Sequence, residues 1–162
     1  MPAKYSDIEI ARKVEERKPL PDNYRDRIQL RDKRGHRERE LDVVGSAGTQ
    51  YRLILRQSNF NTMDFSIILA VNPADSNQLF RLRRYNGKSH EHTNQIEGDT
   101  FYDFHIHHAT ERYQESGARE DAFAEATDRY ADFNAALRCM LEDCGFDMPE
   151  GDQQSLFEEF GV

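Results

Sequence analysis

From Tyr24 to about His108, apolar and polar residues alternate along the chain with a period of two. Such alternation is typical of β-strands that bury one face, because successive side chains point to opposite sides of a strand. The segments between the alternating stretches carry turn residues, for example Asn72-Pro73-Ala74-Asp75. Because these connections are short, they favour an antiparallel meander over parallel strands joined by crossovers. The pattern predicts strands at 24–32, 37–44, 50–57, 63–71, 78–85, 88–94 and 100–108.

Two stretches instead show the helical spacing of three and four residues. Residues 6–18 begin with Ser6-Asp7-Ile8-Glu9, which matches a capping box, and Pro19 ends the run. Residues 120–144 carry a longer stripe, which Gly145 is placed to end. We expect this stripe to cover one face of the sheet, although it could also form a coiled-coil seam between two copies. The stripe consists of Phe123, Ala126, Tyr130, Phe133, Leu137, Met140 and Cys144.

Together these elements predict an α+β fold. We expect an antiparallel meander sheet of five to seven strands, with a short N-terminal helix and a long C-terminal helix packed on one face. A chain of 162 residues is long enough for one domain with its own core. The expected single domain, 1–162, has its N-terminal helix in 1–20, the sheet in 24–108, the covering helix in 118–146 and a tail in 147–162.

The composition favours a cytoplasmic protein. No apolar run approaches the ~18 residues that a membrane-spanning helix needs. The N-terminal residues MPAKYSDIEIARK contain no apolar stretch typical of a secretory signal. The two cysteines, Cys139 and Cys144, are therefore expected to be reduced thiols.

The net charge of −8 is unevenly distributed. Residues 1–90 hold 18 Lys and Arg against 12 Asp and Glu, whereas residues 91–162 hold 4 against 18. This asymmetry suggests a nucleic-acid or protein partner, although two differently solvated faces of one domain would also explain it. We predict that an anionic ligand approaches the strands at 25–39 and 81–92. The acidic stretch should face away, or toward a basic protein partner or second subunit; it contains Glu111, Glu115, Glu120, Asp121, Glu125, Asp128 and Asp132.

Five of the six histidines lie within nineteen residues, as His90-x-His92 and then His105-x-His107-His108. On a strand, each His-x-His places two imidazoles on one face. Imidazole titrates closest to neutral pH among the side chains, so such a cluster indicates proton transfer or metal binding.

The dipeptide Asn86-Gly87 predicts the face on which these histidines lie. Asn-Gly is the strongest short-range signal for a two-residue type I′ hairpin. In that register Tyr85 pairs with Lys88, and one face displays Arg81, Arg83, Tyr85, Lys88, His90 and His92. In the next strand Tyr102, Phe104 and Ile106 suit the core, which leaves His105 and His107 to join the histidine face.

A face that combines imidazoles, guanidiniums, an amine and a phenol suits a phosphodiester substrate. One histidine can remove a proton from the attacking hydroxyl and another can protonate the leaving oxygen, without a metal or other cofactor. Arg or Lys can stabilise the charge that develops on phosphorus. The candidate catalytic residues are His90, His92, His105 and His107, and the candidate substrate-binding residues are Arg81, Arg83, Tyr85, Lys88 and Arg112.

Two other interpretations of the histidines remain open. His90-x-His92-x4-Glu97 resembles the first half of the cupin metal motif, in which two imidazoles and a carboxylate bind the ion. The glycines that frame that motif are missing, and the nearby arginines would raise the cost of holding a cation. Alternatively, the histidines form a hydrogen-bonded polar ladder with no chemistry.

The segment RRYNGKSHEHTN, together with FHIHHATERY, resembles the central motif of a family of small stand-alone bacterial proteins of unknown function. The similarity would cover most of residues 25–144. It implies a bacterial cytoplasmic protein and supplies no activity. At the level of the fold alone, the chain is also similar to ribonuclease toxins of toxin–antitoxin systems, which have small sheets with a basic His/Arg/Tyr face.

The leading functional prediction is a metal-independent RNA-cleaving phosphodiesterase, controlled by an antitoxin-like protein partner. The alternatives are a nucleic-acid- or protein-binding module without catalysis and a cupin-like metal enzyme. We expect RNA or another anionic ligand as partner, no membrane association, and a homodimer as one option for assembly.

Overall fold

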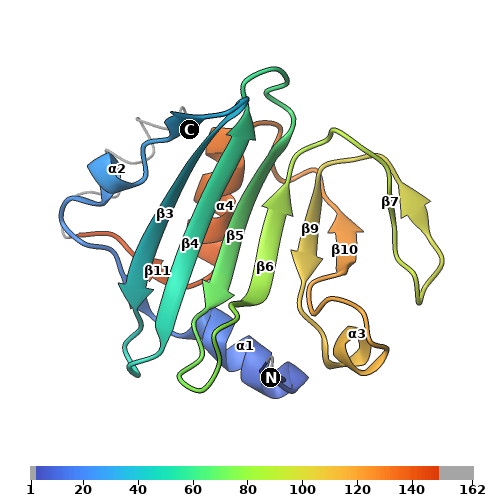
Figure 1. Ribbon diagram of the computed structural model, residues 1–162, viewed down its shortest axis with the longest axis horizontal. Coiled ribbons are helices and arrows are strands. Elements are labelled where there is room, and N and C mark those ends of the chain that lie inside the picture. Colours follow the sequence, from blue (N-terminus) through green and yellow to red (C-terminus); the bar gives the residue numbers. More distant parts are fainter. Residues whose placement is uncertain (1–2, 150–162) are drawn as a thin grey trace.

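A seven-stranded antiparallel sheet forms the centre of the computed structural model, which describes residues 3–149 (Figure 1). Its strand order is β10-β9-β6-β5-β4-β3-β2. The strands are β2 Arg31–Lys33, β3 His36–Val44, β4 Gln50–Ser58, β5 Phe65–Val71, β6 Phe80–Asn86, β9 His105–His108 and β10 Phe123–Ala126. Strands β2 to β6 are neighbours in chain order, so the α+β fold with an antiparallel meander sheet is confirmed.

Four helices and two small strand pairs accompany the sheet within residues 3–149. The helices are α1 Asp7–Glu15, α2 Tyr24–Arg27, α3 Glu111–Glu115 and α4 Phe133–Asp143. The small pairs join β1 Lys18–Pro19 with β11 Phe146–Asp147, and β7 His92–Thr93 with β8 Thr100–Phe101. In the part of the chain that the structure describes, no helix has the length and apolar character to cross a membrane. Residues 150–162, most of the expected tail, lie outside the described residues.

The N-terminal helix starts as predicted. Ser6 Oγ accepts the main-chain N–H of Glu9, and the Glu9 carboxylate accepts the N–H of Ser6, which completes the capping box. The expected first strand is wrong, since Tyr24–Arg27 forms the short helix α2. Tyr24 and Ile28 are both buried, and a spacing of four residues brings their side chains to one side of a helix.

The C-terminal helix is shorter than predicted. It begins after Asp132, whose side chain accepts the N–H of Ala135, and ends before Cys144. Phe123, the first residue of the predicted stripe, lies instead in β10, the edge strand that pairs with β9. Four residues of short strand can match a helical spacing by chance, so the periodicity alone did not separate the two structures.

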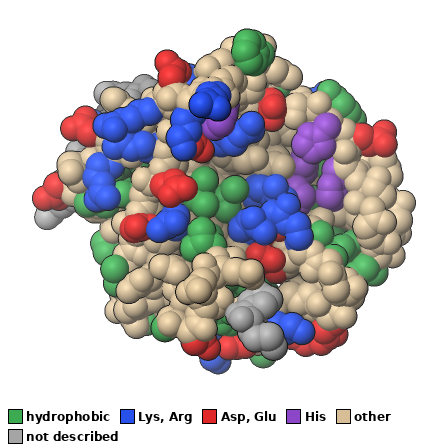
Figure 2. All heavy atoms as spheres, viewed as in Figure 1, with side chains coloured by type: hydrophobic (Ala, Val, Ile, Leu, Met, Phe, Trp, Pro, Cys, Tyr) green, Lys and Arg blue, Asp and Glu red, His purple; other side chains and the backbone are tan. Residues whose placement is uncertain are grey.

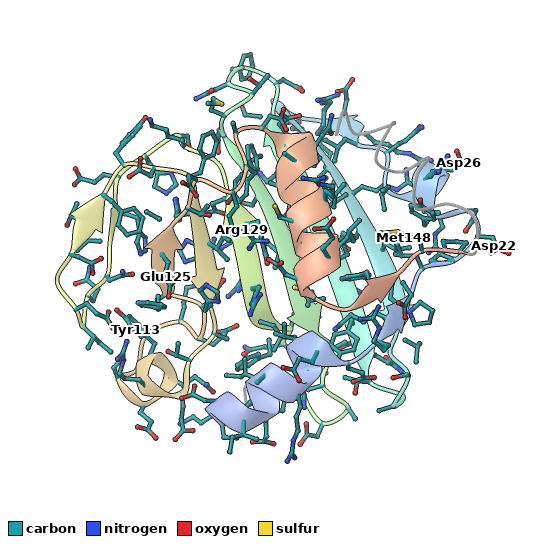
Figure 3. All side chains as sticks on the ribbon, turned by 180° about the vertical axis from the view of Figure 1, so that it is seen from behind. Asp22, Asp26, Tyr113, Glu125, Arg129 and Met148 are labelled. Atoms are coloured by element: carbon teal, nitrogen blue, oxygen red, sulfur yellow. The ribbon has the colours of Figure 1, made fainter. Side chains whose placement is uncertain are left out.

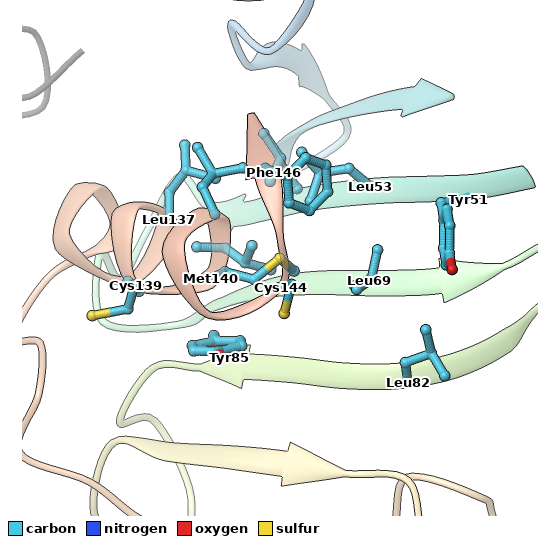
Figure 4. Close-up of a cluster of buried hydrophobic side chains, with 14 of the residues drawn as sticks. Tyr51, Leu53, Leu69, Leu82, Tyr85, Leu137, Cys139, Met140, Cys144 and Phe146 are labelled. Carbon is cyan, nitrogen blue, oxygen red and sulfur yellow. The ribbon is translucent and has the colours of Figure 1, made fainter. Parts of the chain in front are cut away.

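Helix α4 covers one face of the sheet, as the apolar stripe predicted (Figure 3). Leu137 and Met140 are buried in the same hydrophobic cluster as Leu53 and Leu69 of the strands (Figure 4). The opposite face of the sheet has no helix over it in the described residues (Figure 1). In the pairing of β9 with β6, Ile106 lies opposite the buried Tyr85, whereas His105 and His107 lie opposite Asn86 and Arg84. Ile106 therefore faces the core, and His105 and His107 lie on the open face.

Candidate functional site

Three histidines meet on the open face at the β9 end of the sheet. His105 and His107 come from β9, and His92 comes from β7, in the excursion between β6 and β9. One ring nitrogen of each lies within 4.8 Å of those of the other two. His105 and His107 are buried and His92 is half-buried. Figure 2 shows histidine side chains gathered at this end of the sheet.

Main-chain carbonyls fix the rings of the two β9 histidines. Nδ1 of His105 donates to the carbonyl of Asp103 at 2.8 Å, and Nδ1 of His107 donates to that of Asp121 at 2.7 Å. A carbonyl only accepts, so each Nδ1 carries the proton and each Nε2 keeps its lone pair. The Nε2 of His105 uses this lone pair to accept from Nδ2 of Asn86, 3.4 Å away, a weak bond that a metal ion would displace. Such a bond to the second ring nitrogen is the usual support of a metal-ligating histidine.

Asn94 orients the third ring. Its side-chain amide pairs with the main chain of Ala124: Nδ2 donates to the carbonyl at 2.8 Å and Oδ1 accepts the N–H at 2.9 Å. This pairing turns Oδ1 toward Nε2 of His92, 2.8 Å away. Nε2 of His92 is therefore the donor, and Nδ1 has the free lone pair.

Burial keeps the two β9 histidines neutral. It lowers the pKa of His105 to about 4 and that of His107 to about 2, and the nearby Arg84 lowers the pKa of His107 further. Neutral imidazole is the form that binds metals. A general acid works best with a pKa near the operating pH, so these two rings are poorly suited to donate protons at pH 7.

A cluster of arginines adjoins the histidines. Asp121 is fully buried, and Oδ2 lies 3.3 Å from Nε of Arg84 and 3.7 Å from Nε of Arg81, while Oδ1 lies 3.7 Å from Nε of Arg119. Glu120 also contacts Arg81, with its Oε2 3.0 Å from the main-chain N. The main-chain carbonyl of Asp121 binds His107, so one residue connects the arginines to the histidines.

All four histidines that were predicted as catalytic come together. The ring centroid of His105 lies 6.0 Å from that of His90, 5.4 Å from that of His92 and 5.0 Å from that of His107. His90 is exposed, and its Nδ1 lies 3.2 Å from Ser89 Oγ. Their convergence does not depend on the predicted hairpin, which is absent.

The predicted Asn86-Gly87 hairpin is wrong. A type I′ turn needs positive φ at both central residues, and neither residue has it. Gly87 instead donates its N–H to the carbonyl of Phe65, and β6 pairs with β5 and β9 rather than with residues 88–92. A single register change exchanges the faces of a strand. Arg84 therefore lies on the histidine face, where Arg83 was predicted. Arg81 stays on that face because the pairing of β5 with β6 shifts between Leu69 and Ala70.

Two of the predicted substrate-binding residues lie under α4 instead. Tyr85 is buried and donates to Asp143 Oδ2 at 2.5 Å, and Arg83 Nη1 lies 3.4 Å from the Tyr85 hydroxyl. Arg129 binds the same carboxylate through two hydrogen bonds, of 2.7 and 2.8 Å. Both predicted residues thus contribute to the covered face, because they flank Arg84 in β6 and successive side chains point to opposite faces of a strand.

The other predicted residues divide between the site and its surroundings. Arg81 lies on the open face with Arg84, whereas Lys88 is exposed and its Nζ lies 5.9 Å from the centre of the Tyr102 ring. Arg112 forms an ion pair with Glu97, which also accepts a hydrogen bond from Tyr113. The cupin-like ligand set His90, His92 and Glu97 is not assembled, because Glu97 is engaged outside the histidine group.

The acidic stretch does not face away as a whole. Glu120 and Asp121 contact arginines of β6, contrary to the predicted separation of charges. The basic strand predicted from residue 25 is also wrong in part, since Arg25 and Arg27 lie on the helix α2. Charge that is separated along the chain can be adjacent in space once strands pair.

Sequence reasoning missed Arg84, Arg119 and Asn94. Arg84 would have been assigned correctly had β6 been paired directly with the His105–His107 strand, where it faces His107. Asn94 and Arg119 lie in irregular segments without periodicity, so only their tertiary contacts identify them. Comparisons of this chain with protein-family models, curated proteins and solved structures find no match.

Proposed function

We propose that this protein binds a divalent metal ion of the zinc class through His92, His105 and His107 and is a metal-dependent hydrolase. The observation that carries the proposal is the gathering of three ring nitrogens within 4.8 Å, on rings whose tautomers are set by other groups. In a tetrahedral zinc site with Zn–N of about 2.0–2.1 Å, ligand nitrogens lie roughly 3.3 Å apart. Closing the remaining gap requires a small movement, which His92 on the two-residue strand β7 can supply.

Three histidines favour a catalytic role over a structural one. Structural zinc sites usually have four protein ligands, whereas catalytic sites have three and leave one position for water or substrate. A zinc ion lowers the pKa of its bound water to about 7, which provides a nucleophile at neutral pH. The exposed His90 lies beside the three histidines, with its ring centre 6.0 Å from that of His105, where it could contact a substrate.

Metal-independent RNA cleavage is the second candidate, supported by the contact between His90 and His105. It requires a protonated histidine at neutral pH, and the low pKa values of His105 and His107 argue against these two rings in that role. Binding of RNA without cleavage and an antitoxin-like partner stay predictions. Whether the protein binds a metal, and whether cleavage requires that metal, distinguishes these functions.

Metal content tests the proposed site directly. Protein purified without chelators should contain about one equivalent of zinc-class metal per chain, and Co²⁺ substitution should produce the visible absorption of a tetrahedral centre. His107→Gln and the less buried His92→Gln should both lose the metal. His36→Gln removes a half-buried histidine of the same sheet face, outside the proposed ligand set, and should retain the metal. Equal metal content in all four proteins would contradict the proposal.

Activity tests the reaction class. RNA and bis(p-nitrophenyl) phosphate should be hydrolysed by the zinc-loaded protein, with the rate lost in EDTA and restored by zinc. His92→Gln should reduce the rate by at least about 100-fold, as expected for loss of the group that supplies the nucleophile. Cleavage of RNA that survives EDTA and is lost in His90→Ala would instead establish the metal-independent mechanism.

A further inference from the structure

We propose that Arg81, Arg84 and Arg119 form a binding site for a phosphoryl group beside the three histidines. The inference rests on the proposed function, since it assigns the substrate class of that same site. It depends on three features of the arginine cluster: its excess positive charge, the nitrogens that it leaves without partners, and its position next to His107.

The charges within the cluster do not balance. Three guanidiniums face two carboxylates, those of Asp121 and Glu120, which leaves one positive charge. Partly buried positive charge without a partner is costly, and an anion would relieve that cost. A bound divalent metal would increase the attraction further.

The nitrogens of the cluster are incompletely used. Nε of Arg81 and Nε of Arg84 are buried without hydrogen-bond partners among the described residues, as are both carboxylate oxygens of Asp121. Asp121 therefore holds the guanidiniums by charge at 3.3–3.7 Å rather than by hydrogen bonds. Within residues 3–149, the terminal nitrogens of these three arginines donate no hydrogen bond either. They remain available to an oxyanion from solvent.

The position of the cluster links it to the histidines. Arg84 pairs directly across the strands with His107, and such pairs place their side chains about 5 Å apart on one face. Figure 2 shows Lys and Arg side chains beside the histidines on the open face. An anion bound by Arg84 would thus lie next to His107, one of the three proposed metal ligands, and within reach of a reaction that the metal would promote.

A phosphoryl group matches this arrangement better than a carboxylate. Guanidinium binds phosphate through paired N–H donors, and three guanidiniums can contact several oxygens of a tetrahedral group. A planar carboxylate has only two oxygens to offer. The combined charge of the arginine cluster and a divalent ion also favours a phosphate dianion over a monoanion.

Calorimetric titration with inorganic phosphate tests the site, at low ionic strength and with both metal-free and zinc-loaded protein. The wild type should bind saturably, and Arg84→Gln should weaken binding at least tenfold. Arg119 is 55% exposed at its side chain, so Arg119→Gln has little effect on folding and should weaken binding several-fold. The matched control is Arg52→Gln, which removes an arginine of the same face whose partners are Asp42 and Glu40 and should change affinity less than twofold.

Further probes identify the source of the phosphate. Binding of phenyl phosphate supports a small phosphate ester as the substrate, and binding of an RNA trinucleotide only when it is 5′-phosphorylated supports an RNA end. Acetate should compete poorly. The proposal is overturned if the wild type shows no saturable binding, if Arg84→Gln and Arg52→Gln weaken it equally, or if acetate competes as well as phosphate.

Metal content measured on the same samples separates the two proposals. Phosphate binding that depends on Arg84 in a protein without metal affinity would retain the anion site and refute the metal-dependent function. If the wild type binds metal but not phosphate, the metal site is retained and the phosphoryl site is refuted.

Discussion

The side chain of Lys18 shows how one buried residue can join two helices. Its ammonium donates to the carbonyls of Lys13 and Glu16 at 2.8 Å, of Val14 at 3.0 Å and of Cys144 at 2.6 Å. These carbonyls lie at the C-terminal ends of α1 and α4, where a helix lacks internal donors and favours positive charge. A fully buried lysine here therefore serves both helices as a common C-terminal cap.

Replacing this ammonium should destabilise the fold strongly. Lys18→Met keeps most of the stem volume but leaves four carbonyls without their donor, so we expect the free energy of unfolding to fall by on the order of 3 kcal/mol. Lys13→Met removes an ammonium that lies 4.4 Å from the centre of the Tyr5 ring and attracts the exposed Glu9, and it should cost less than about 1 kcal/mol. Urea denaturation of both variants provides the comparison. Similar losses would show that the four carbonyls do not depend on Lys18.

At the scale of elements, the excursion between β6 and β9 decides whether the histidines meet. It leaves the sheet at Gly87, whose N–H binds the carbonyl of Phe65, while the N–H of Lys88 binds that of Met63. A Cβ at position 87 would lie 1.8 Å from the Met63 carbonyl oxygen. Glycine is required here for this close approach and not for a left-handed conformation.

Gly87→Ala should therefore disturb both the fold and the metal site. The methyl group would displace β5 or the excursion, and we expect a loss of at least about 3 kcal/mol in the free energy of unfolding, together with weaker binding of Co²⁺. Gly48→Ala is the control, since that residue has positive φ but open space around its Cβ and should cost only about 1–2 kcal/mol. The steric argument fails if Gly87→Ala is tolerated better than Gly48→Ala.

At the scale of the whole molecule, the histidines couple stability to pH. Burial lowers the pKa of His105 and of His108 to about 4 and that of His107 to about 2, from an ordinary value of 6.5. The unfolded chain therefore binds more protons than the folded protein as the pH falls below 6.5. Stability should be complete above that pH and decline toward the folded pKa values.

Urea denaturation in EDTA at pH 7.5 and pH 5.5 measures this effect. We expect the free energy of unfolding to fall by on the order of 1 kcal/mol for each of the three histidines. Carboxylates titrate mainly below this range. A free energy of unfolding that is equal at the two pH values would contradict the assigned burial of the histidines.

The sequence alone determined the features that depend on local pattern. Alternation located β3, β4, β5 and most of β6, because these strands bury one face against a common core. The capping box located α1, and the stripe from Phe133 to Cys144 located α4. The His-x-His spacing also indicated correctly that His105 and His107 share a face.

Only the tertiary structure decided how these parts meet. Hydrogen bonding to β5 overrode the turn preference of Asn86-Gly87, so β6 paired with β9 and brought Arg84, not Arg83, to the histidines. Residues 123–126 form the edge strand β10 instead of the expected helix, which places Asp121 beside Arg84 and His107. Such contacts join residues far apart in the chain, and their free energy depends on burial and charge that no local pattern contains.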